Sequence, residues 1–300
     1  MRGRRLTDGR PDIHHQAEAL AAGLPPLLVA AERVAATVSQ GVHGRRRVGQ
    51  GETFWQFRRY QSGDSAQAID WRQSAKSQPL YVRETEWEAA QSVWLWRDAS
   101  PSMVYRSSQA PLDKVFRAEI LLLALASLLV RGGERVALLG SGRLPGSGRA
   151  QLNRMAAMIE KGDGGNQSLP APEPLPRYGR AVLFGDFLSP LDEIASAIDG
   201  LSAQGIRGHL VRILDPAEET LPFSGRIRFA GLEGEGDVLI PRVEAARRDY
   251  RAAFAAHHRG LAALARSAGW TFAAHRTDRP PEAVLLSLFA ALSQAGPKTC

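Results

Sequence analysis

The 300-residue chain lacks several sequence features that would indicate a particular class of function. Cysteine occurs once, at Cys300, so the chain can form no internal disulfide and no cysteine-based metal site. The most apolar run, from Ile120 to Val130, is well below the roughly 20 residues that a membrane-spanning helix needs. The basic N-terminal residues are not followed by the apolar run of a secretory signal. We therefore expect a protein of the cytoplasm without an integral membrane segment.

Two catalytic signatures are also missing. The phosphate-binding pattern G-x-x-x-x-G-K-[ST] does not occur, so we expect no ATP hydrolysis by this chain alone. The Gly-x-Ser-x-Gly turn of serine hydrolases is not evident either. Threonine is missing over a long stretch, between Thr85 and Thr220.

Positive charge, by contrast, is plentiful. The formal net charge is +7, and eight arginines against four acidic residues fall within the first fifty positions. A basic run such as Arg45, Arg46 and Arg47 raises nucleic-acid binding as an alternative. Because these residues are not interleaved with aromatic side chains for base stacking, we favour a solvated arginine-rich surface.

The chain changes character twice. Alanine and leucine at helical spacing predict a helical segment over residues 1–40, and glycine, arginine and aromatics predict short strands and loops over 41–90. From Ser92 onward strands alternate with helices, which predicts a Rossmann-like α/β domain with a doubly wound, mostly parallel sheet over 91–296. The expected strands are 92–97, 135–139, 181–184, 208–214 and 270–274, the helices are 112–131, 152–161, 191–201, 242–266 and 282–292, and a hairpin spans 226–240.

Ligands of such sheets bind outside the carboxyl ends of the strands. The pattern D-x-S-x-S follows the first strand as Asp98, Ser100 and Ser102, and Asp186 follows the third strand. Alternate residues of an extended turn face the same side, so these oxygen donors can share one cavity suited to Mg²⁺ or Mn²⁺. The alternative is that Asp98 and the serines only cap the next helix.

Two further polar groups have open interpretations. Asp215, Glu218 and Glu219 follow the fourth strand and either surround the cation or form an ordinary acidic loop. A second group contains arginines that satisfy carboxylates well, so we favour a half-buried structural network over a partner-facing surface. Its members are Arg58, Arg59, Asp64, Asp70 and Trp71.

The D-x-S-x-S pattern and Val182–Phe187 together resemble the metal-ion-dependent adhesion site of von Willebrand factor A domains. An upstream series is similar to the bacterial family called domain of unknown function 58, and the resemblance covers about residues 40 to 290. That series, with its later counterpart, reads Gly49-Gln50-Gly51-Glu52-Thr53-Phe54, Phe57-Arg58-Arg59-Tyr60, Gly63-Asp64, Ile69-Asp70-Trp71-Arg72, Ser74-Ala75, Val82-Arg83-Glu84 and Asp215-Pro216-Ala217-Glu218.

The resemblance implies a metal site made of Asp98, Ser100, Ser102 and Asp186. Adhesion-type sites also use a threonine, which this chain lacks, and Ser168 is the nearest substitute. The implied function is a non-enzymatic interaction module that works with a MoxR-type AAA+ ATPase on an unidentified client protein. We expect weak Mg²⁺ or Mn²⁺ binding, strengthened by a partner carboxylate.

A metal-dependent phosphatase is the enzymatic alternative. Such enzymes place a nucleophilic aspartate after the first strand and a second aspartate two positions later as general acid. Ser100 occupies that second position here and cannot serve as the acid.

Overall fold

The computed structural model describes residues 48–49, 53–61, 64–65, 67, 69–76, 79–86, 90–162, 167–234 and 236–294. These residues fall into two compact units. One contains Gln91–Phe289, and the other contains the described parts of Ala30–Ala90 and Ala290–Cys300. The helical segment expected over residues 1–40 lies outside the described residues.

The smaller unit contains an antiparallel sheet with the strand order β1-β3-β2. Ile69 adds an isolated bridge to Val82 of β3. A single helical turn is capped by Asp70, whose side chain accepts a hydrogen bond from the Gln73 amide (2.9 Å). The elements are β1 (Val48–Gly49), β2 (Thr53–Arg59), α3 (Trp71–Ser74) and β3 (Tyr81–Glu86).

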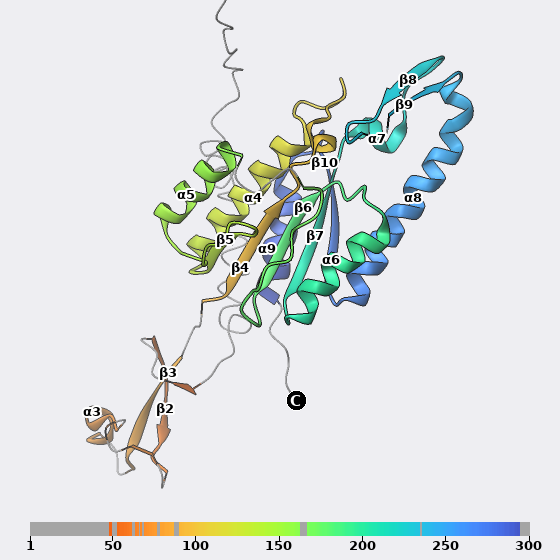
Figure 1. Cartoon of the computed structure of the whole chain (residues 1–300). Coiled ribbons are helices and arrows are strands. Elements are labelled where there is room, and N and C mark those ends of the chain that lie inside the picture. Colours follow the sequence, from red (N-terminus) through yellow and green to blue (C-terminus); the bar gives the residue numbers. More distant parts are fainter. Residues whose placement is uncertain are drawn as a thin grey trace, which may run out of the picture. The chain divides into compact units, whose positions relative to one another are not determined.

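The larger unit is built on a five-stranded sheet in the order β10-β7-β6-β4-β5 (Figure 1). Every neighbouring pair in it is parallel, which confirms the expected α/β class. The strand that follows β4 in the chain lies on one side of it, and all later strands lie on the other, so the order reverses between β4 and β6. The strands are β4 (Ser92–Arg97), β5 (Arg135–Leu138), β6 (Arg180–Gly185), β7 (Arg207–Leu214) and β10 (Thr271–Arg276).

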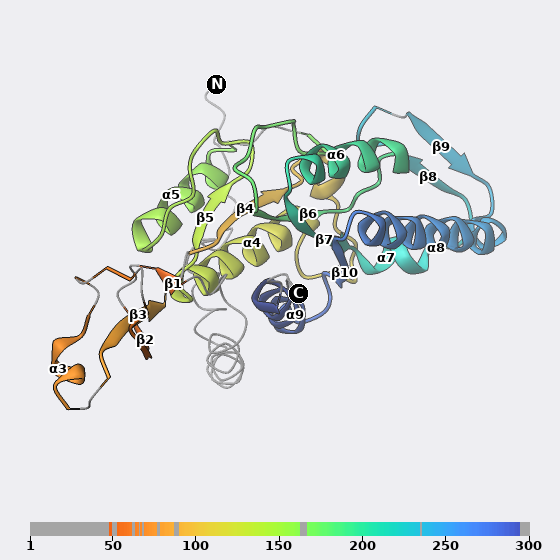
Figure 2. The ribbon, with the colours of Figure 1, turned by 90° about the horizontal axis from the view of Figure 1, so that it is seen from below.

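Helices cover both faces of this sheet (Figure 2). Residues of α6 and α8 pack on Trp94, Trp96 and Leu183 in one apolar cluster, and α4 contacts β4, β5, β6 and β7. The helices are α4 (Lys114–Arg131), α5 (Arg149–Glu160), α6 (Leu191–Ala203), α7 (Pro216–Thr220), α8 (Val243–Ser267) and α9 (Glu282–Gln294), and the hairpin is β8 (Ile227–Ala230) with β9 (Asp237–Ile240).

Burial on both faces explains why the strands read as continuous apolar runs. In β4, Val93 and Leu95 are as deeply buried as Trp94 and Trp96, which point the opposite way. Helix α4 is buried over nearly its whole length, from Lys114 to Leu129. Each fully buried leucine contributes about 1.5–3 kcal/mol relative to exposure, so this helix and its strand neighbours form the core that positions the strand ends.

In the larger unit, two short helices were not expected from the sequence. A 3₁₀ helix spans Pro101–Val104, and α7 follows directly after β7. Helix α7 begins with a capping box, in which Asp215 accepts from the helix backbone and the Glu218 side chain accepts from the Asp215 amide.

Among the described residues, no helix is both long enough and apolar enough to cross a membrane.

Close packing makes a testable contrast between two glycines. A Cβ on Gly208 of β7 would lie 2.2 Å from the ring of buried Trp270, whereas a Cβ on Gly200 of α6 would meet nothing within 4 Å. We expect Gly208→Ala to lower the free energy of unfolding by about 1–3 kcal/mol. Gly200→Ala should raise it by about 0.5–1 kcal/mol, because alanine is the better helix former. Urea unfolding of both variants checks this, and equal effects would contradict the packing.

Candidate functional site

Acidic residues directly follow three neighbouring strands of the parallel sheet. Asp98 comes after β4, Asp186 after β6 and Asp215 after β7. Asp98 and Asp186 therefore flank the place where the strand order reverses, which is where open α/β sheets bind ligands. The two strand ends approach closely at Gly185, where a Cβ would lie 3.0 Å from the Asp98 Cβ. Glycine at this position lets the Asp98 side chain lie against the end of β6.

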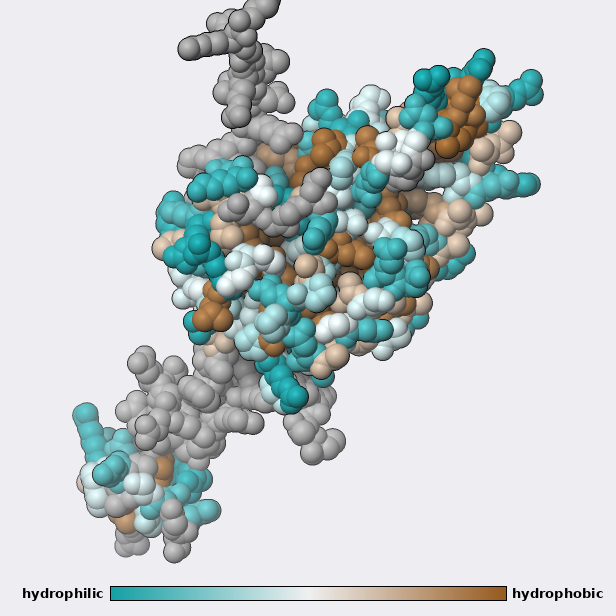
Figure 3. All heavy atoms as spheres, viewed as in Figure 1, coloured by the Kyte–Doolittle hydropathy of each residue, from teal (hydrophilic) through white to brown (hydrophobic). Residues whose placement is uncertain are grey.

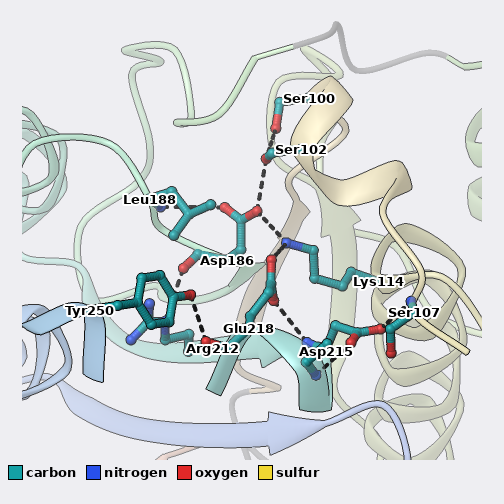
Figure 4. A network of polar contacts seen from close by, with 11 residues as sticks. Ser100, Ser102, Ser107, Lys114, Asp186, Leu188, Arg212, Asp215, Glu218 and Tyr250 are labelled. Atoms are coloured by element: carbon teal, nitrogen blue, oxygen red, sulfur yellow. Dashed lines mark hydrogen bonds and ion pairs between the residues drawn. The ribbon is translucent and has the colours of Figure 1, made fainter. Parts of the chain in front are cut away.

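A chain of hydrogen bonds joins the predicted ligands. The Ser100 amide donates to Asp98 Oδ1 (2.8 Å), and the Ser100 and Ser102 hydroxyls are 3.0 Å apart. The Ser102 hydroxyl donates to Asp186 Oδ2 at 2.8 Å (Figure 4). All four residues predicted from the sequence thus come together, across 84 positions of the chain between Ser102 and Asp186.

This network also bears on the helix-capping alternative. The cap of α4 is Asp113, whose side chain accepts from the Phe116 amide (2.8 Å). Ser100 precedes the 3₁₀ helix but makes no side-chain capping bond. Asp98 does accept one local amide bond, yet the serine hydroxyls bond each other and Asp186, so the group does more than cap a helix.

Asp98 is the most unusual member of the group. Its side chain is fully buried, and its Oδ2 atom has no hydrogen-bond partner among the described residues. Burial, and then the negative charge of Asp186, raises the pKa of Asp98 to about 6. A buried carboxylate with an unpaired oxygen is costly, because water no longer solvates its charge.

Lys114, the first residue of α4, supplies a positive charge to this network. Its ammonium lies 2.8 Å from Asp186 Oδ2 and also pairs with Glu218 Oε1. The Lys114 side chain is 1% exposed, so bulk water does not reach the ammonium in either ion pair. Burial opposes the charged form, but Asp186 and Glu218 together hold the pKa of Lys114 above its usual value. Lys114 is therefore an ammonium fixed between two carboxylates.

Glu218 is itself held in place from three directions. Its Oε2 accepts from the Asp215 amide (2.8 Å), and its carbonyl accepts from the Tyr250 hydroxyl of α8 (2.6 Å) (Figure 4). Arg212 of β7 lies nearby, fully buried, with its Nε donating to the Asp186 carbonyl (3.1 Å). The Arg212 guanidinium also stacks on the Phe254 ring at 4.5 Å. Asp186 is thus fixed through both its side chain and its backbone.

The remaining predicted residues play separate parts. The carboxylate of Asp215 accepts from two amides, those of Ala217 and Ser107, both at 2.8 Å. Ser168 accepts from the Ser189 hydroxyl at 3.2 Å. Glu219 pairs with Arg276. Asp215 therefore orders the loop and α7 around the cluster.

Of the residues expected around Arg58 to form a half-buried network, Arg58 and Asp64 are half-buried and paired, whereas Arg59 and Trp71 are exposed. Arg58 forms a two-pronged ion pair with Asp64, at 3.0 and 2.9 Å. Arg59 is exposed, and Asp70 caps α3. Trp71 is 64% exposed. The Arg58–Asp64 pair ties the end of β2 to the turn that follows it.

The donor set suits a hard cation in its chemistry. Carboxylate and hydroxyl oxygens are the ligands that Mg²⁺ and Mn²⁺ prefer, and Asp98 Oδ2 is a donor not used by another described residue. Within the described ranges, no three His, Cys, Asp or Glu side chains gather as a metal cluster. A cation here would therefore depend on the Ser100 and Ser102 hydroxyls as well as the two aspartates. It would also meet the Lys114 ammonium, which already contacts Asp186.

The fold and the site define a Rossmann-like α/β protein with a buried acidic and hydroxyl cluster at its switch point. The chain belongs to the family of proteins of unknown function DUF58, whose model matches residues 56–260. This confirms the resemblance to that family seen in the sequence.

Relatives extend over most of the chain. An uncharacterized protein of Mycobacterium tuberculosis and one of Mycobacterium bovis are each 29% identical over 278 residues, which covers 87% of this chain and 86% of theirs. Among solved structures, the conserved hypothetical protein BatB from Bacteroides thetaiotaomicron is 11% identical. It matches with a TM-score of 0.36 over 68% of this chain and 98% of its own.

Proposed function

We propose that this protein is a non-enzymatic interaction module of the cytoplasm that binds a partner protein at the carboxyl ends of β4 and β6. Asp98, Ser100, Ser102 and Asp186 would hold a divalent cation, Mg²⁺ or Mn²⁺. When bound, the ion would offer a coordination position to a carboxylate of the partner. The observation that carries this proposal is the buried, unpartnered Asp98 Oδ2 beside the chain of hydroxyls that ends at Asp186.

The surroundings of the cluster support a protein partner. Ser102 is only half-buried, so the cluster reaches the surface at this residue. Val104 and Leu188 lie two residues beyond Ser102 and Asp186 and are 57% and 52% exposed. Elsewhere in the larger unit, Leu232, Val238 and Leu239 of the β8–β9 hairpin are also exposed (Figure 3). A polar centre with exposed apolar neighbours is typical of a protein-binding surface.

The chemistry of the cluster favours this role over the two alternatives. A phosphatase of the aspartate-nucleophile type needs an acid at position 100, where a serine hydroxyl is bonded to Ser102. Nucleic acid would bring phosphates towards the carboxylates of Asp98 and Asp186, and like charges repel. The arginines at 45–47 lie outside the described residues. We therefore retain the adaptor role, with a MoxR-type AAA+ ATPase and its client as the proposed partners.

Thermal unfolding tests the cation. A ligand that binds only the native state must raise the unfolding midpoint. We expect millimolar Mg²⁺ or Mn²⁺ to raise the midpoint of the purified chain by a few degrees, about the effect of 1–2 kcal/mol. Asp98→Ala should abolish this rise, whereas replacing the exposed Asp199 with alanine should preserve it. An equal rise in Asp98→Ala would place the ion elsewhere and overturn the cation site.

The adaptor role has its own readout. The proposal predicts co-purification with the ATPase in Mg²⁺, reduced in a chelator and in the Asp98→Ala variant. If neither the chelator nor Asp98→Ala reduces co-purification, the ATPase does not bind through this cluster.

A further inference from the structure

The position of Lys114 is unusual for a buried lysine. It is the first residue of α4, where the helix dipole and the free amides favour a negative charge and disfavour an ammonium. The helix after it is almost entirely buried and mostly apolar. Burying a lysine ammonium at such a place costs free energy unless it is paired with negative groups. Its partners therefore indicate its role.

One of those partners is Asp186, a carboxylate that the proposed cation also requires. Asp186 Oδ2 accepts from the Ser102 hydroxyl and from the Lys114 ammonium, both at 2.8 Å. The proposed divalent ion would also need an oxygen of the Asp186 carboxylate, which the Ser102 hydroxyl already contacts. Two cations that share one carboxylate repel each other, and burial makes that repulsion strong.

The second partner gives the ammonium an alternative. Glu218 also pairs with Lys114 and is fixed by the Asp215 amide and the Tyr250 hydroxyl. Lys114 can therefore give up Asp186 without becoming an isolated buried charge. Lys114 therefore has one partner inside the cluster, Asp186, and one outside it, Glu218. This arrangement allows the ammonium to compete with a metal ion for Asp186.

We propose that Lys114 is a built-in cation that competes with the divalent ion for Asp186 and so keeps the affinity of the cluster for divalent ions low. This inference rests on the proposed function and specifies how the same site is regulated. Occupancy of the cluster by the divalent ion then depends on a change that shifts the Lys114 ammonium from Asp186 to Glu218. A partner protein whose carboxylate adds to the ion's coordination would provide that bias, because it strengthens only the ion-bound state.

Calorimetric titration with Mn²⁺ tests the competition. Lys114→Met alone leaves two buried carboxylates without their cation, so the comparison uses a charge-balanced background. Glu218→Gln keeps an oxygen for the Asp215 amide, and Lys114→Met with Glu218→Gln differs from it only by the ammonium. We expect the double variant to bind Mn²⁺ about tenfold or more tightly than Glu218→Gln, the scale of removing one neighbouring charge from a buried site. Lys114→Gln on the same background replaces it if the methionine variant does not fold.

The control locates the binding. Asp186→Asn added to the double variant should cancel the gain in affinity, which distinguishes the cluster from exposed carboxylates. If Mn²⁺ binds Glu218→Gln and the double variant equally, Lys114 does not compete and the inference is wrong while the cation site remains. If Mn²⁺ binds none of the proteins, including the wild type, the cation site itself is wrong.

Discussion

Replacing Lys114 with methionine should lower the free energy of unfolding by about 3–5 kcal/mol, the cost of removing one partner from a buried ion pair. Methionine fills a similar volume, so the loss comes from charge and not from a cavity. The substitution leaves Asp186, whose side chain is 2% exposed, and Glu218, at 18%, without the ammonium between them. Urea unfolding of the full chain in a chelator at neutral pH measures the effect.

A matched lysine sets the scale for this experiment. Lys161 is exposed at the end of α5, so Lys161→Met should change stability by no more than about 0.5 kcal/mol. Adding Glu218→Gln to Lys114→Met should recover part of the loss, because one of the two unpaired charges disappears. A Lys114→Met variant as stable as Lys161→Met would show that the ammonium is not paired as described.

The fold of the larger unit was largely predictable because its signals are local. Strand β4 was predicted at the same residues that it occupies, and β7 and α8 were predicted to within a residue at each end. Buried parallel strands are short apolar runs, and helices alternate with them, so one pattern specifies both the elements and their parallel arrangement. Because parallel strands end at one edge of the sheet, Asp98 and Asp186 could be placed together as well.

Lys114 and Arg212 are not recognisable as part of the site from the sequence, and for Glu218 the sequence leaves open whether it surrounds the cation or belongs to an ordinary acidic loop. Their contacts join residues that are far apart in the chain, such as the 104 positions between Lys114 and Glu218, and no periodicity encodes such a pair. A partial signal did exist, because a lysine in the first turn of an apolar helix and an arginine within an apolar strand are both costly to bury. Asp215-Pro216-Ala217-Glu218 likewise has the spacing of a capping box, which predicts the short helix α7.

The unpaired oxygen of Asp98 leads to a pH-dependent prediction. The pKa of Asp98 is about 6 in the folded protein against 3.8 as the reference value for the unfolded chain. The folded state therefore binds the proton more tightly, so Asp98 favours folding below about pH 4, and this contribution is lost as the pH rises through 6. At about 1.4 kcal/mol for each pH unit, the full loss is about 3 kcal/mol.

Asp98→Asn removes this titration while retaining an oxygen for the Ser100 amide. In a chelator, the variant should be more stable than the wild type by up to about 3 kcal/mol at pH 8, and the difference should shrink towards zero near pH 4. Asp199→Asn, at an exposed position of α6, should track the wild type within about 0.5 kcal/mol throughout. A constant difference between Asp98→Asn and wild type from pH 4 to 8 would contradict the buried, unpartnered carboxylate. With millimolar Mg²⁺ the advantage of asparagine at pH 8 should fall, because the cation stabilises only the protein that has a carboxylate to offer.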